Sequence, residues 1–245
     1  MLPVVHLRVH TLHIAVSTHA VVLVLAVCVG IAVAALRARA PGFVVAAGPP
    51  VAAGAIAGAW LLYGALHGPP AGGLASMGGI AGGILVAVLA GRVARRRLVL
   101  VLDDLAPGAL AALGLGRIGC FLAGCCAGQP TTAPWGVVLP ALGPEPRHPL
   151  QLYAAAFDLV LALWVARTVG PPGRVACRAL VGLGLGRLAL EALRDPVATD
   201  PILGGTTTVA QVGAVVLVLV GWVVGWRRVD RSRPRRYLFA SSRAR

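Results

Sequence analysis

Seven long apolar runs constrain this chain more than any other feature of its sequence. Each run is long enough to cross the hydrocarbon core of a bilayer as a helix, which takes about 20 residues. The runs cover residues 14–36, 43–66, 72–91, 98–124, 149–168, 175–193 and 206–226. Backbone polar groups in lipid must be satisfied within the chain, so helices are the expected form. The sequence therefore predicts an all-α integral membrane protein with about seven transmembrane helices.

The composition agrees with a membrane protein rather than a soluble one. Only 12% of the residues are charged and 58% are hydrophobic, whereas a soluble domain carries about 25% charged residues. We expect residues 1–226 to form a single polytopic transmembrane domain, followed by a basic cytoplasmic tail at 227–245. The fourth run holds "LDDLAPG" with Pro107, which predicts a kink or a break in that helix.

The arginines predict the orientation of the chain in the membrane. The formal net charge is +14, and seventeen of the 22 basic residues follow the first, third, fifth and seventh runs. If the runs alternate in direction, these arginines share one side, so the positive-inside rule places the N-terminus outside and the C-terminus in the cytoplasm. They flank apolar runs instead of coating a soluble face. We therefore expect the lipid bilayer as a partner and no nucleic acid.

Among the charged side chains within or at the end of the predicted spans, four are candidate site residues, namely Arg117, Arg187, Glu191 and Arg194. A charge at membrane depth costs several kcal/mol unless it is paired or hydrated, so it marks a functional site by default. Arg187, Glu191 and Arg194 share one helix face by their spacing. Arg194 has a second interpretation, as part of a salt-bridged helix end at the headgroups. Two internal cations against one internal carboxylate leave positive charge unbalanced, which predicts an anionic ligand such as a lipid phosphate.

Two further segments hold candidate ligand contacts. In "RHPLQLY", residues 147–153, the side chains of His148, Gln151 and Tyr153 precede or open the fifth run. They either contact a ligand or form an interfacial belt. In "SMGGIAGG", residues 76–83, Gly78 and Gly79 permit either close helix packing or close approach of a ligand to the backbone. The spacing of these glycines alone favours packing.

The segment "GRIGCFLAGCCAG", residues 116–128, brings three cysteines close together in the sequence. Cys120, Cys125 and Cys126 have the spacing C-x4-C-C, which lacks the usual ligand spacing and a second pair. We therefore expect no metal and no cofactor. A disulfide is an alternative if the segment lies near the outer face, and small buried thiols are the favoured interpretation.

Six segments in order resemble the prolipoprotein diacylglyceryl transferase family. They are "SMGGIAGG", "LDDLAP", "GRIGCFLAGCCAG", "RHPLQLY", "GRLALEALRD" and "TTTVAQVG". The resemblance implies an enzyme of lipoprotein biosynthesis in the bacterial plasma membrane. Such an enzyme transfers a diacylglyceryl group from phosphatidylglycerol to the lipobox cysteine thiol of a preprolipoprotein, and glycerol phosphate leaves. The implied partners are phosphatidylglycerol and preprolipoprotein signal peptides.

The resemblance also implies roles for individual residues. Arg117 and Arg187 are expected to bind the lipid headgroup, and Glu191 to orient Arg187 or to take part in proton transfer. These three form the predicted catalytic set. The predicted substrate-binding residues are Gly78, Gly79, Gly116, Gly119, His148, Gln151, Tyr153 and Arg194.

The chain departs from the family pattern at several polar positions. Met77 stands where the family has a histidine proposed as the base, and Cys120 and Cys125 replace an asparagine and a glutamate. Met77 cannot accept a proton, so His19 and Glu191 are the candidate bases. One alternative is a degenerate member that binds anionic phospholipid but uses another acceptor or is not catalytic. Another is a lipid or anion transporter, which often has an internal repeat of its spans, and none is visible here.

Overall fold

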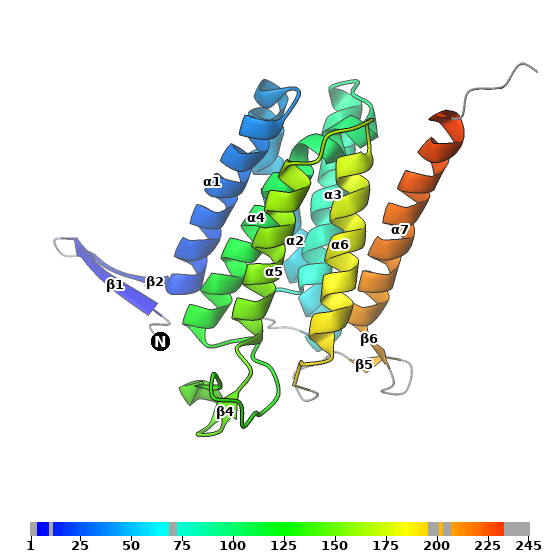
Figure 1. Ribbon diagram of the computed structural model, residues 1–245. Coiled ribbons are helices and arrows are strands. Elements are labelled where there is room, and N and C mark those ends of the chain that lie inside the picture. Colours follow the sequence, from blue (N-terminus) through cyan, green and yellow to red (C-terminus); the bar gives the residue numbers. More distant parts are fainter. Residues whose placement is uncertain (1–3, 10–11, 69–72, 196–200, 203–206, 233–245) are drawn as a thin grey trace, which may run out of the picture.

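The structure, a computed structural model, describes residues 4–9, 12–68, 73–195, 201–202 and 207–232. Within these residues each predicted apolar run contains one helix. The helices run up and down side by side, with the connections gathered at the two ends (Figure 1). They are α1 (Thr18–Arg37), α2 (Pro41–His67), α3 (Ser76–Val93), α4 (Leu98–Ala123), α5 (Leu150–Ala166), α6 (Arg174–Glu191) and α7 (Val209–Ser232).

The outer faces of the bundle are apolar. Large side chains such as Val24, Leu61, Val160 and Leu219 are more than half exposed, which is unusual for a soluble monomer when so many occur together. Helices α1 to α4 are long and apolar enough to cross a membrane, and α5 and the 209–225 part of α7 are shorter apolar helices. The chain is therefore a helical membrane protein.

The first helix begins later than the sequence predicts. Residues 14–17 belong to β2 (Leu12–Ser17), which pairs antiparallel with β1 (Val4–Val9) ahead of α1. Polar and apolar residues alternate in "VHLRV", and this period of two favours a strand over a helix. Helix α1 then starts at Thr18 because the Ser17 hydroxyl accepts a hydrogen bond from Ala20 N at 3.1 Å, which caps the helix.

Two helices differ from the prediction, and short hairpins lie between some of the helices. Helix α4 continues through Pro107, so the predicted break is wrong. Helix α7 continues to Ser232, beyond the predicted start of the tail, and residues 233–245 lie outside the described part of the chain. Short hairpins join helices at one end: β3 (Val137–Val138) pairs with β4 (Pro146–Arg147), and β5 (Pro201–Ile202) pairs with β6 (Thr207–Thr208). A single 3-10 turn, Pro140–Leu142, lies between β3 and β4.

Helix α4 is the centre of the bundle, because it contacts α1, α5 and α6 along much of its length. The buried core joins α4 to α5, α6 and α7 through Leu110, Leu161, Leu183 and Leu217. At the contact with α1, a side chain at Gly108 would overlap the backbone carbonyl of Gly30. The small residues thus let two helices approach closely, and α4 can present polar groups at both of its ends.

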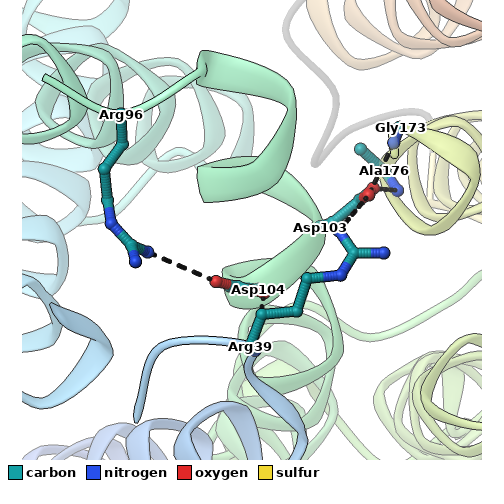
Figure 2. A network of polar contacts seen from close by, with 6 residues as sticks. All are labelled: Arg39, Arg96, Asp103, Asp104, Gly173 and Ala176. Atoms are coloured by element: carbon teal, nitrogen blue, oxygen red, sulfur yellow. Dashed lines mark hydrogen bonds and ion pairs between the residues drawn. The ribbon is translucent and has the colours of Figure 1, made fainter. Parts of the chain in front are cut away.

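Near the start of α4, Asp103 caps a neighbouring helix. Its carboxylate accepts hydrogen bonds from Gly173 N at 2.5 Å and from Ala176 N at 2.8 Å, the N-cap residue and a first-turn residue of α6 (Figure 2). These backbone donors have no partner within α6, and the positive end of the helix favours a carboxylate there. Arg39 adds an ion pair at 3.5 Å. A side chain of α4 therefore fixes the position of α6.

The adjacent Asp104 fastens two other segments to α4. Its carboxylate accepts a hydrogen bond from Arg39 N at 3.1 Å, in the connection between α1 and α2. It also lies 3.7 Å from the guanidinium of Arg96, in the turn between α3 and α4 (Figure 2). Both aspartates are buried. This pair stabilises the end of the bundle where the predicted cytoplasmic arginines cluster.

Candidate functional site

A cavity lies at the opposite end of α4, between the last turns of α4 and α6 and the first turn of α5. The residues that line it are Arg117, Cys126, Leu150, Gln151, Ala154, Arg187, Leu190, Glu191 and Arg194. Five of the predicted site residues are in this set: Arg117, Gln151, Arg187, Glu191 and Arg194. Helices that are far apart in the sequence thus bring three arginines to one cavity.

Arg187 is held by a buried carboxylate that the sequence analysis overlooked. Its Nη2 lies 2.7 Å from Asp158 Oδ2, and the two side chains are 8% and 1% exposed. Asp158 is on α5 and projects toward α6. The expectation of a single internal carboxylate is therefore wrong. The Nε of Arg187 is buried and makes no hydrogen bond to the residues that the structure describes.

Glu191 has different partners from the ones expected. Its carboxylate lies 3.0 Å from Arg194 Nε and accepts a hydrogen bond from the Thr208 hydroxyl at 3.0 Å. The expectation that Glu191 orients Arg187 is therefore corrected, because Asp158 orients Arg187. The contact with Thr208 connects the end of α6 to the start of α7, so Glu191 also fixes one wall of the cavity.

Arg117 differs from the other two arginines of the cavity. It is partly buried on α4, and within the described residues neither an ion pair nor a hydrogen bond is found for its guanidinium. The neighbourhood holds three guanidinium groups against the carboxylates of Asp158 and Glu191. Among the residues that the structure describes, one positive charge there remains uncompensated. An anion that accepts hydrogen bonds in the cavity would balance that charge.

Gln151 connects the cavity wall to the loop after α4. Its side chain is 1% exposed and donates a hydrogen bond from Nε2 to the Cys125 carbonyl oxygen at 2.5 Å. Its Oε1 is buried without a partner among the described residues. His148 Nδ1 lies 3.3 Å from the Tyr153 hydroxyl, and neither residue lines the cavity. The predicted group "RHPLQLY" therefore supplies two cavity residues, Leu150 and Gln151, and a nearby polar pair.

Backbone hydrogen bonds join the loops around the opening of the cavity. Gly128 N donates to the His148 carbonyl and Gln129 N to the Leu193 carbonyl, both at 3.0 Å. The Gln129 side chain also donates to the Ala192 carbonyl at 3.1 Å. These bonds join the chain after α4, before α5 and after α6. Arg147 and Asp195 form an ion pair across the same region.

The predicted glycines lie outside the cavity. Gly78 on α3 faces Gly58 on α2, so closely that any side chain would overlap the Gly58 carbonyl. Gly79 faces the same helix, and Gly119 packs against His19 and Val22 of α1, whereas no atom lies within 4 Å of a side chain built at Gly116. For Gly78, Gly79 and Gly119 the structure therefore supports helix packing.

We predict that Gly78→Ala lowers the free energy of unfolding by about 1–3 kcal/mol, because α2 and α3 must separate to admit the methyl group. Gly83→Ala, in the same helix, is the matched control. Its new methyl group would lie 3.4 Å from Ala55, an ordinary contact, so this change is expected to be neutral or stabilising. Thermal unfolding in detergent measures both. Equal stability of the two variants would contradict the packing interpretation.

The two candidate bases and the methionine also have definite places. Met77 packs against Gly213 of α7 and the adjoining hydrophobic core, and it does not line the cavity. His19 lies against Gly119, two residues from Arg117, and its Nδ1 is buried without a partner among the described residues. A histidine is therefore near the cavity end of α4, although it comes from α1.

Comparison with known proteins agrees with the resemblance seen in the sequence. The model of the family described as prolipoprotein diacylglyceryl transferase matches residues 7–227. Curated relatives named phosphatidylglycerol–prolipoprotein diacylglyceryl transferase include one from Shewanella sp. (strain MR-4), 36% identical over 154 residues and 61% of this chain. Another, from Brucella ovis, is 38% identical over 167 residues and 64% of this chain. The matched region spans 58% of the length of each relative.

Proposed function

Because this chain belongs to the prolipoprotein diacylglyceryl transferase family, we propose that it transfers a diacylglyceryl group from phosphatidylglycerol to a prolipoprotein cysteine thiol. In this reaction a carbon–sulfur bond forms and the bond between the glyceryl carbon and the phosphate oxygen breaks. The thiol loses its proton, and glycerol phosphate leaves. The names of the relatives supply the two substrates, and the cavity supplies a site suited to the anionic one.

The observation that carries the proposal is the uncompensated cation at the cavity. A phosphate diester that becomes a leaving glycerol phosphate gains negative charge, and fixed cations stabilise such charge without reorganising. Arg187 is already held by Asp158, whereas Arg117 has a free guanidinium as far as the structure describes its surroundings. We assign Arg117 as the group that binds the phosphate of the lipid, with Arg187 and Arg194 beside it.

The remaining groups have supporting roles in this proposal. Gln151 has a buried oxygen that finds no partner in the described part of the chain, which suits a hydroxyl donor such as those of the glycerol headgroup. His148 and Tyr153 lie beside the cavity mouth and can contact the incoming peptide. Glu191 is occupied by Arg194 and Thr208, so it is a positioning residue unless those bonds open. We assign no general base.

We also propose the orientation and location of the chain. Seven spans with the N-terminus outside and the C-terminus in the cytoplasm place most arginines on the inner side of a bacterial plasma membrane. The cavity then lies at the outer end of the bundle, and the polar pair Asp103 and Asp104 lies at the inner end. Residues 227–245 form the basic segment on the cytoplasmic side.

A reconstituted assay tests the function. The purified protein in vesicles of phosphatidylglycerol, supplied with a lipobox peptide, is expected to yield the diacylglyceryl thioether, detected by its mass. Vesicles of phosphatidylethanolamine alone and a peptide with serine in place of cysteine are the controls, and neither should yield product. Binding of phosphatidylglycerol without product would favour a degenerate family member. Phosphate or lipid flux across the vesicle wall without product would favour a transporter.

A further inference from the structure

Three cysteine thiols converge at the end of α4. The sulfur atoms of Cys120, Cys125 and Cys126 all lie within 4.8 Å of one another, and all three are free thiols. The spacing C-x4-C-C gave no reason to expect a metal, because it lacks the usual ligand spacing and a second pair. In the fold, a tight turn nevertheless brings Cys125 and Cys126 back onto Cys120.

The turn that gathers the thiols has an unusual backbone. Gly124 ends α4 in the left-handed conformation with φ 75°, and Cys126 also has a positive φ of 60°. A side chain is costly in that region, and such outliers gather at ligand sites. Cys125 N donates a hydrogen bond to the Cys120 carbonyl at 3.1 Å. The backbone of Cys126 is therefore strained in the conformation that places Cys125 and Cys126 beside Cys120.

The turn is held in place before any ligand binds. Gln151 donates a hydrogen bond to the Cys125 carbonyl, and Gly128 N donates to the His148 carbonyl. Anchors on both sides of Cys126 keep the three sulfur atoms on one side of the turn. A preorganised set of ligands loses less entropy on binding.

The charge of the surroundings suits anionic sulfur. Cys126 lines the same cavity as Arg117, Arg187 and Arg194. Three thiolates and one d10 metal ion would carry a net negative charge, which the positive field of these three guanidinium groups favours. Cys125 and Cys126 are exposed, so an ion can reach them from outside the bundle.

We propose that Cys120, Cys125 and Cys126 form a three-thiolate site for a thiophilic d10 metal ion, Zn²⁺ or Cu⁺. Metal–sulfur bonds of about 2.3 Å place the sulfur atoms of a trigonal site about 4 Å apart, so small side-chain rotations complete the site. Each thiol releases its proton to solvent on binding. The site does not depend on the transferase activity. A disulfide would use only two of the three thiols and would need an oxidant.

Metal binding to the full chain in detergent tests the proposal. The protein is reduced with a phosphine, incubated with Zn²⁺ alone or Cu⁺ alone, desalted and analysed for metal and by X-ray absorption. We expect one ion per chain with three sulfur neighbours. Each substitution Cys120→Ser, Cys125→Ser or Cys126→Ser is expected to weaken binding at least tenfold. Cys28→Ser and Cys177→Ser are the matched controls and should bind as the parent does.

Two outcomes would overturn the proposal. One is that the triple serine variant retains as much metal as the parent, with unchanged sulfur coordination. The other is that the reduced parent retains no metal, whether or not mild oxidation converts two of the three thiols into a disulfide seen by peptide mapping. Circular dichroism of the variants separates either outcome from a failure to fold.

Discussion

Arg117→Ala is expected to lower the rate of diacylglyceryl transfer by about 100- to 1,000-fold, the usual cost of removing one fixed donor for developing negative charge. The guanidinium of Arg117 has no partner in the described part of the chain and lines the cavity, so its removal breaks no ion pair or hydrogen bond among those residues. The loss should appear mainly in kcat if Arg117 acts on the leaving group. Initial rates with phosphatidylglycerol and a lipobox peptide measure it.

Two matched variants test whether the loss of rate is specific to the guanidinium of Arg117. Arg117→Lys keeps the charge but loses the planar fork of donors, so its rate is expected to fall between those of the parent and of Arg117→Ala. Arg92→Ala makes the same chemical change on an exposed arginine at the other end of the bundle and should leave the rate unchanged. A variant Arg117→Ala with full activity would remove Arg117 from the mechanism.

Asp158→Ala is expected to lower the free energy of unfolding by about 3–5 kcal/mol, because it leaves the buried guanidinium of Arg187 without its counter-charge. The ion pair is 2.7 Å long, and both side chains are almost fully buried. Unfolding in detergent with increasing denaturant measures the change.

A double variant tests whether the loss of stability comes from the unpaired charge of Arg187 rather than from the loss of the ion pair itself. Asp158→Leu combined with Arg187→Met removes both charges and keeps the volume, so it should recover most of the lost stability while remaining inactive. Glu145→Ala, which truncates an exposed carboxylate, should change stability by less than about 0.5 kcal/mol. If Asp158→Ala unfolds as the parent does, the ion pair is not a structural element of the bundle.

The helices could be predicted from the sequence because lipid leaves the backbone few choices. Each of the seven apolar runs contains a helix whose ends differ from the prediction by a few residues. The first run was extended too far toward the N-terminus, since residues 14–17 are apolar enough to join it. Residues 4–9 and 12–17 pair as β1 and β2. The alternation of polar and apolar residues in "VHLRV" was the available signal for this hairpin.

The cavity was predicted in part. Arg117, Arg187, Glu191, Arg194 and Gln151 do meet at one place, and helical spacing could predict only the three that share α6 or its end. The partner of Arg187 could not be found from spacing, because Asp158 lies on another helix and its direction depends on how α5 packs against α6. An acidic residue in the middle of the fifth apolar run was the signal that could have identified it.

Asp103 and Asp104 tie three segments of the chain to one end of α4. The connections that hold Arg39 and Arg96, and the start of α6, are bound to α4 near one end of the bundle, and the loops at the other end are joined by backbone hydrogen bonds. Asp103 and Arg117 are separated by about 21 Å along α4, at 1.5 Å per residue. The bundle is therefore tied at both ends, which keeps the groups that line the cavity at fixed positions relative to α4.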